Sequence, residues 1–205
     1  MTAPSCFAVM TFLSKMAEYL QVNEQQHPAH ITLQKVSPDG FCEFKTALQE
    51  SFRVAAEADL GQPLTEPIPS DEDIVQSVAV TGAASYWIMA EGRRVGGAVV
   101  VIDETSNKNS LSFFFISTNQ QSRGLGGQAW KAIEREYPHT KVWETVTPYF
   151  EKRNIHFYVN RCGFSIVEFY NKFQPDPNQP LAQTDSEEDD MEMFRMLKVM
   201  APDSL

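Results

Sequence analysis

Cysteine is scarce in this chain of 205 residues, which contains three, at Cys6, Cys42 and Cys162. Their number is odd, they lie far apart, and no C-x-x-C pair or cysteine and histidine spacing of the zinc type is present. A disulfide framework is therefore not expected, and neither is a metal site. The default compartment for such a chain is the reducing cytoplasm.

Long apolar segments are absent as well. No run approaches the roughly 18 residues that a membrane-spanning helix needs. The first cation of the chain is Lys15, so its beginning lacks the positively charged region of a secretory signal. We therefore expect a soluble, unprocessed, cytoplasmic protein with no membrane partner.

A basic stripe is the third missing feature. Lys and Arg number 17 against 27 Asp and Glu, which gives a net charge of −10. Nucleic-acid binding is not expected, because it requires basic residues gathered on one surface and interleaved with aromatics. The negative charge is uneven, since residues 57–92 contain acidic but no basic side chains, whereas residues 93–184 carry a surplus of positive charge. The second half could therefore hold a small anionic cofactor.

Composition and periodicity divide the chain into two parts. Residues 1–30 combine a helical pattern with a polar linker and predict an N-terminal extension. Residues 31–200 predict one domain, in which a proline-rich and acidic loop over about 171–190 is expected to be flexible.

Helical and strand patterns alternate within the predicted domain. The expected order is a strand over 31–36, helices from Ser37-Pro38 and over 70–80, strands over 85–90, 95–102 and 111–116, a helix over 124–136, a strand over 142–146, a helix over 148–160, and strands over 164–169 and 193–199. The three closely spaced strands predict an antiparallel meander. The fold class is α/β with a mixed, mostly antiparallel sheet.

One polar loop carries a motif with chemical meaning. It comprises Gln121, Ser122, Arg123, Gly124, Leu125, Gly126 and Gly127, between a predicted strand and a predicted helix. Glycines at a helix start let backbone N–H groups converge on one point, where the helix dipole adds positive charge. Arg123 could add a charge-assisted contact. The loop therefore predicts a phosphate site, with a merely structural glycine turn as the alternative.

The same loop also fits a dinucleotide fingerprint, G-x-G-x-x-A, through Gly124, Gly126 and Ala129. Glu144 lies twenty residues after the first glycine, where such sites place a ribose-binding carboxylate. Against this alternative, seven polar residues separate the strand from the first glycine, and the preceding strands are predicted to be antiparallel. A nicotinamide- or flavin-dependent oxidoreductase is therefore the less favoured hypothesis.

The string Gln121-x-x-Gly124-x-Gly126 resembles the acyl-CoA pyrophosphate loop of the GNAT superfamily of N-acetyltransferases. The order of elements over 31–199 is similar to that fold, and Phe157-Tyr158 with Gly163-Phe164 is similar to the end of the family's fourth helix. The resemblance implies a sheet with helices on both faces and acetyl-CoA as co-substrate. It also implies that the strands before and after the loop and its helix splay apart around the pantetheine arm.

The resemblance further implies which residues touch the cofactor. These are the backbone of Ile116, Ser117 and Thr118, the loop residues Gln121, Ser122, Arg123, Gly124, Leu125, Gly126 and Gly127, and the helix residues Asn154 and Tyr158. Two departures from the family pattern stand out. Glu151 occupies the usual asparagine position, which leaves Asn154 as the nearest asparagine, and Tyr158 lies five rather than four residues before Gly163. Either the helix end is bulged or Tyr158 is rotated by about 100°.

Transfer of acetyl to an amine needs a base to remove a proton and benefits from an acid at the leaving thiolate. Tyr158 is the candidate acid, with a packed core tyrosine as the alternative. Glu144 is the candidate base, because it alternates with Val142 and Val146 on one strand face, where a carboxylate needs a function or a partner. A structural ion pair is the alternative for Glu144.

The predicted function is acetyl-CoA-dependent N-acetylation of a primary amine in a ternary complex. The acceptor is a small molecule or a peptide, and the acidic segment 57–92 favours a cationic one through electrostatic steering. The alternative is a non-catalytic CoA-binding sensor or interaction module. A homodimer is left open.

Overall fold

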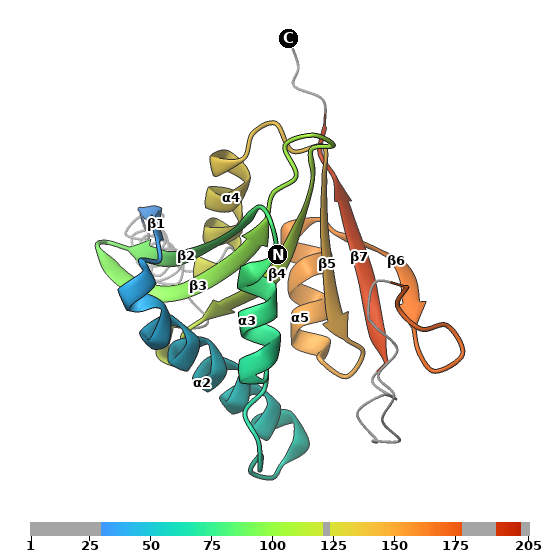
Figure 1. The fold of residues 1–205 in the computed structure, drawn as a ribbon. Coiled ribbons are helices and arrows are strands. Elements are labelled where there is room, and N and C mark those ends of the chain that lie inside the picture. Colours follow the sequence, from blue (N-terminus) through green and yellow to red (C-terminus); the bar gives the residue numbers. More distant parts are fainter. Residues whose placement is uncertain (1–29, 121–123, 178–191, 202–205) are drawn as a thin grey trace, which may run out of the picture. The chain divides into compact units, whose positions relative to one another are not determined.

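A seven-stranded sheet organises the second part of the chain (Figure 1). The computed structural model describes residues 30–120, 124–177 and 192–201. The strands are β1 (Ile31–Lys35), β2 (Ala83–Ala90), β3 (Arg93–Val101), β4 (Lys108–Ile116), β5 (Val142–Pro148), β6 (Ser165–Tyr170) and β7 (Met193–Val199), in the spatial order β1-β2-β3-β4-β5-β7-β6. The predicted α/β class and the mixed, mostly antiparallel sheet are confirmed.

Helical elements connect the strands close to the predicted positions. They are the 3₁₀ turns η1 (Pro38–Gly40) and η2 (Thr118–Gln120), the α-helices α2 (Phe41–Leu60), α3 (Asp71–Ala79), α4 (Leu125–Glu136) and α5 (Lys152–Phe157), and the π-helical turn η3 (Tyr158–Cys162). The helix predicted over 148–160 begins later because Pro148 completes β5. It also changes type at Tyr158. The helical pattern over 7–20 lies outside the described residues.

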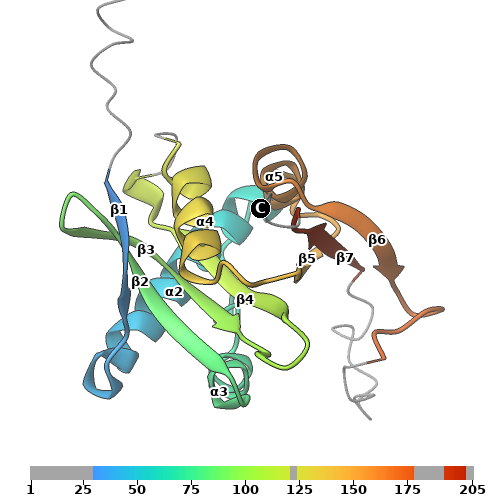
Figure 2. The same ribbon diagram turned by 90° about the horizontal axis from the view of Figure 1, so that it is seen from above.

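The helices cover both faces of the sheet, as neighbouring residues of β2 show. Tyr86 packs in a core cluster with Trp130 of α4 and with Tyr158, whereas Trp87 packs in a second cluster with Phe44 of α2 and Ile74 of α3. Successive strand residues point to opposite faces. The α4 and α5 helices therefore cover one face and the α2 and α3 helices the other (Figure 2).

The parallel pair β4 and β5 separates after a short paired segment. It extends from Lys108 with Val142 to Ser110 with Glu144 and no further, although both strands continue. On its other side β4 has a one-residue bulge at Ser112, since Val100 pairs with Leu111 and Val99 with Phe113. We call the diverging segments, 111–116 of β4 and 145–148 of β5, the fork; Figure 1 shows the two strands separating there.

Strand directions exclude the dinucleotide-binding alternative. Such a domain needs a parallel sheet on both sides of its glycine loop. Of the six pairings between the described strands, the one between β4 and β5 is parallel and the others are antiparallel. No helix in the described ranges is long and apolar enough to cross a membrane.

Candidate functional site

Three residues from separate elements meet where the fork opens. The Thr145 hydroxyl donates to the carbonyl oxygen of Leu111 at 3.0 Å, so a side chain spans the two strands just beyond their last backbone pair. The Tyr158 hydroxyl lies within hydrogen-bonding reach of Thr145. A tyrosine hydroxyl is thereby connected through a threonine to the point at which the sheet opens.

Two adjacent aromatic residues cover the two arms of the fork. Phe157 stacks on Phe114 of β4, with ring centroids 5.4 Å apart and an interplanar angle of 18°. The next residue, Tyr158, interacts with Thr145 of β5. The end of α5 and the start of η3 therefore close the fork on one face of the sheet, and this face is the one that carries α4.

The backbone of β4 directs polar groups into the fork. In an antiparallel ladder, residues alternate in directing both backbone groups to one edge or the other. The Ser117 amide donates to the Val95 carbonyl at 2.8 Å, so the backbone amide of Ser117 faces β3. Phe114 and Ile116 have the alternate orientation, and their backbone groups are directed toward β5. The Ser117 carbonyl accepts from the Gln120 amide in the turn η2, which also includes Thr118.

The helix α4 begins beside the fork with two glycines in its first turn, after a glycine N-cap. Gly124 takes the left-handed conformation at φ 70° as N-cap, and a Cβ on Gly127 would meet nothing within 4 Å. A Cβ on Gly126 would lie 3.0 Å from the Phe157 ring, so this glycine lets α5 approach α4. Leu125, between Gly124 and Gly126, is buried. The predicted loop residues Gln121, Ser122 and Arg123 lie outside the described residues.

The unusual spacing of Tyr158 and Gly163 is explained by the π-helical turn η3. Five residues from Tyr158 to Cys162 form one wide turn, which ends at Gly163 with φ 83°. A π-turn takes up one extra residue, which matches the bulged alternative from the sequence. Tyr158 is buried in the cluster below α4, and burial raises the pKa of its hydroxyl well above the ordinary value.

Glu144 lies on the opposite face and is held in an ion pair. Arg195 of β7 donates from Nε and Nη2 to the two carboxylate oxygens of Glu144, both at 2.9 Å. Its third nitrogen, Nη1, donates to Glu168 of β6 at 2.8 Å, and Tyr170 donates to the same Glu168 oxygen at 2.9 Å. The Tyr170 hydrogen bond and then Arg195 lower the pKa of Glu168 below its ordinary value. Arg195 and Thr145 could not be identified as site residues from the sequence, because their partners depend on which strands pair and in which register.

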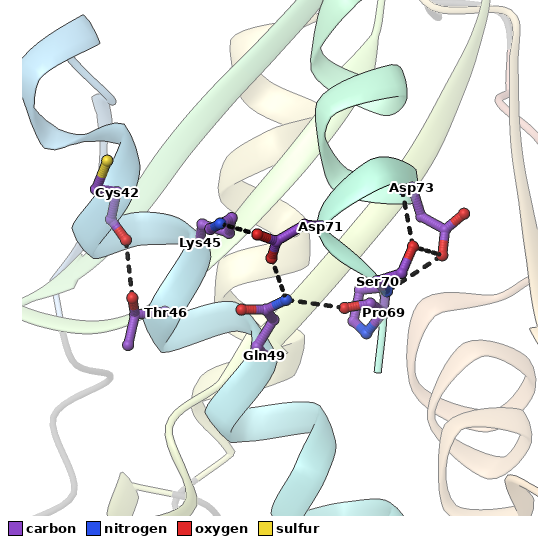
Figure 3. A network of polar contacts seen from close by, with 8 residues as sticks. All are labelled: Cys42, Lys45, Thr46, Gln49, Pro69, Ser70, Asp71 and Asp73. Carbon is purple, nitrogen blue, oxygen red and sulfur yellow. Dashed lines mark hydrogen bonds and ion pairs between the residues drawn. The ribbon is translucent and has the colours of Figure 1, made fainter. Parts of the chain in front are cut away.

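Much of the acidic segment is used locally, as Figure 3 shows for the junction of α2 and α3. Lys45 of α2 pairs with Asp71, and Gln49 donates to Asp71 at 2.9 Å and to the Pro69 carbonyl at 3.1 Å. Asp73 completes a capping box with Ser70. These carboxylates stabilise helix ends and the helix pair, which reduces the charge available for steering a cationic acceptor.

Asn154, the remaining predicted cofactor residue, lies in the first turn of α5 and accepts the Tyr158 amide through its backbone carbonyl. It is therefore on the same helix as Phe157 and close along the chain to the fork. No cluster of three or more potential metal ligands occurs among the described residues.

Comparison with known proteins gives one family and several structural neighbours. The family model described as the acetyltransferase (GNAT) family matches residues 46–164. An uncharacterized Bacillus subtilis protein, YrkN, is 48% identical over 163 residues, which cover 77% of this chain and 87% of that protein.

Two solved structures with bound cofactor share the fold. A Bacillus subtilis acetyltransferase in complex with CoA has a TM-score of 0.57 and 16% identity, covering 85% of this chain and 100% of that one. A GNAT family acetyltransferase from Elizabethkingia anophelis with acetyl-CoA bound has a TM-score of 0.56 and 15% identity, covering 83% and 98%. At these identities the likeness shows the fold.

Proposed function

This chain belongs to the GNAT acetyltransferase family, and from that premise we propose that it transfers the acetyl group of acetyl-CoA to a primary amine by direct attack in a ternary complex. The observation that carries the proposal is the fork, at which Leu111, Thr145 and Tyr158 converge beside the glycine-lined start of α4. These features offer a hydrogen-bonding edge, an acid and an anion site.

We assign cofactor binding to the start of α4 and to the edge of β4 in the fork. The pyrophosphate would lie against the amides of Gly124, Leu125, Gly126 and Gly127, with Gln121, Ser122 and Arg123 completing the loop. The pantetheine arm would follow β4 along Ile116, Ser117 and Thr118, with Asn154 on α5 as a further contact. An amide of β4 that is directed into the fork would polarise the thioester carbonyl as charge develops on its oxygen.

Group transfer then requires two proton movements. The amine nitrogen attacks the carbonyl carbon, the carbon–sulfur bond breaks, and the CoA thiolate takes the proton of the Tyr158 hydroxyl. The Tyr158 hydroxyl is protonated at neutral pH, and its raised pKa makes it a weaker acid than a solvent-exposed tyrosine. The proton of the attacking amine is assigned to Glu144 through a water molecule, with Arg195 holding both carboxylate oxygens in a fixed orientation.

One observation favours a second candidate function. Because Arg195 occupies both oxygens of Glu144, the carboxylate is poorly placed to accept a further proton. A CoA-binding sensor or interaction module without turnover would need no base at all. This alternative shares the cofactor site with the enzyme and differs in the chemistry.

Thiol release from acetyl-CoA over a panel of amines separates the two candidates. The panel comprises diamines and polyamines, aminoglycosides, lysine peptides, and peptides with a free N-terminus, with product mass as confirmation. We expect acetylated product from at least one class. Saturable CoA binding without thiol release on any amine would support the sensor.

A further inference from the structure

A lysine from the last strand holds the end of the wide turn that carries Tyr158. Lys198 of β7 donates from Nζ to the Cys162 carbonyl at 2.6 Å, which is the last carbonyl of η3. The same ammonium pairs with Glu134 of α4. Both side chains are largely buried, at 21% and 16% exposed. Lys198 thus joins β7, α4 and η3.

The position of the ammonium suits the end of a helical turn. Carbonyl groups at a helix C-terminus carry partial negative charge and lack helical partners, so a cation there is favourable. The other end of the turn is fixed within the backbone, because the Tyr158 carbonyl accepts from Gly163 and from Phe164. Lys198 therefore adds a side-chain contact at the last carbonyl of η3, beyond the backbone bonds that close the turn.

Aromatic packing connects this contact to the Tyr158 side chain. Lys198 Nζ lies over the Trp130 ring, 5.8 Å from its centroid. Trp130 packs on Phe164 at 5.2 Å, and Phe164 packs edge-on against Tyr158 at 5.6 Å. A change at Lys198 would act on Tyr158 through both the turn and these rings.

We propose that Lys198, oriented by Glu134, is a positioning residue that holds the π-helical turn so that the Tyr158 hydroxyl stays at the fork. The inference rests on the proposed acid role of Tyr158. A largely buried ion pair is costly to desolvate, and apolar residues of similar volume often stabilise a fold as well or better. Setting the geometry of a wide turn is a function that apolar residues at these two positions could not supply.

The chain contains a similar but more exposed ion pair that serves as a control for this contact. Arg94 of β3 also joins a strand to a helix through a glutamate, Glu43 of α2, and also lies over a tryptophan ring, Trp87, at 4.5 Å. Trp87 packs on the α2 and α3 face of the sheet, whereas η3 packs on the other face. Arg94→Met therefore removes the same kinds of interaction at a place remote from Tyr158.

The experiment is a double-mutant cycle on the full chain. The variants are Lys198→Met, Lys198→Arg, Glu134→Gln and Arg94→Met, each made with Tyr158 and with Tyr158→Phe. For each we would measure kcat, KM for the amine, the dissociation constant of CoA and the melting temperature. Hydrogen exchange of the segment 158–164 would report on the turn without requiring activity.

Lys198→Met is expected to lower kcat by up to about 10²-fold, as a small misplacement of a catalytic group does. The CoA dissociation constant should stay within about twofold, because the start of α4 is untouched. Lys198→Arg should restore most of kcat. In the Tyr158→Phe background, Lys198→Met should cause no further loss of kcat, since both substitutions act through the Tyr158 hydroxyl. Exchange over 158–164 should increase in Lys198→Met and not in Arg94→Met.

Two results would overturn the inference. One is unchanged exchange over 158–164 in Lys198→Met, and the other is an equal loss of kcat with and without the Tyr158 hydroxyl. Failure of the proposed function would look different, since the unmodified chain would then release no thiol. In that case the exchange measurement still decides whether Lys198 holds the turn.

Discussion

The Phe164 amide donates to the Tyr158 carbonyl oxygen, six residues earlier in the chain, at 3.0 Å. Gly163 donates to the same oxygen, so the backbone closes tightly around a turn that is one residue wider than an α-helical one. The tyrosine is thereby fixed at the start of the turn while Gly163 reverses the chain into β6. This closure fixes the backbone of Tyr158, and the further contact of Lys198 with the Cys162 carbonyl acts on the end of the same turn.

Tyr158→Phe should lower kcat by about 10² to 10⁴-fold, the usual contribution of a positioned general acid. The ring packing against Phe164 and the rest of the core cluster is retained, so CoA affinity should not change. Loss of the hydrogen bond to Thr145 should cost about 1 kcal/mol of stability. Steady-state kinetics and CoA titration of both proteins are the measurements. A mutant with the kcat of the unmodified protein would show that Tyr158 only packs.

The pH dependence of kcat/KM should separate the ionisation of Tyr158 from that of the amine acceptor. Burial raises the pKa of Tyr158, so the hydroxyl stays protonated, and able to donate, beyond its ordinary value of 10.0. An alkylamine acceptor with a pKa near 10 must be deprotonated to attack. We therefore expect kcat/KM to rise with pH up to about 10 with no falling limb from Tyr158. A falling limb below that pH, present in the unmodified protein and absent in Tyr158→Phe, would support Tyr158 as the acid and contradict its raised pKa.

The sequence predicted the element order well because core residues repeat at helical and strand periods. Phe44 and Leu48, for example, lie four residues apart on one face of α2 and are both fully buried. The site was predicted less completely. Arg195 is distant in sequence from Glu144, and they meet because β7 inserts between β5 and β6, a placement that periodicity does not encode. The π-turn was visible as a spacing anomaly, but the spacing alone fitted a rotated tyrosine equally well.

A charge placed at the start of α4 should abolish cofactor binding without harming the fold. Gly127→Glu meets open space, improves helix propensity, and adds a carboxylate where the helix dipole favours one, so the apo protein should melt higher. The same carboxylate repels the pyrophosphate. At 100 times its dissociation constant, acetyl-CoA should stabilise the unmodified protein by about 2.7 kcal/mol and this variant not at all.

Gly127→Gln is the neutral control of equal size and should keep most of the shift. Gly126→Glu is a poorer choice, because its side chain would also press on Phe157. If acetyl-CoA raises the melting temperature equally in the unmodified protein, Gly127→Glu and Gly127→Gln, the phosphate does not bind at this helix start.

Removal of residues 1–29 should leave acetyl-CoA binding intact, because we propose that the domain begins near residue 31. Ile31 opens β1, is buried, and pairs with Ala90 of β2. A chain beginning at His30 should therefore fold and show the same ligand-induced melting shift. A chain beginning at Ser37 loses β1 and should be destabilised. If the longer of the two chains is insoluble or fails to bind, the N-terminal segment belongs to the domain.

The roles of Glu144 and Glu168 can be separated because one arginine holds both. Glu144→Gln removes the proposed base, and should lower kcat by about 10² to 10⁴-fold. Glu168→Gln removes a contact to the same guanidinium without touching the proposed base, and kcat should persist. Since Tyr170 and Arg195 lower the pKa of Glu168, its contribution to stability is present above its ordinary value of 4.5 and is lost as pH falls. The destabilisation by Glu168→Gln should therefore be smaller in acid than at pH 7. If Glu144→Gln instead lowers the melting temperature and spares kcat, Glu144 is a structural partner of Arg195, and the amine must lose its proton to water.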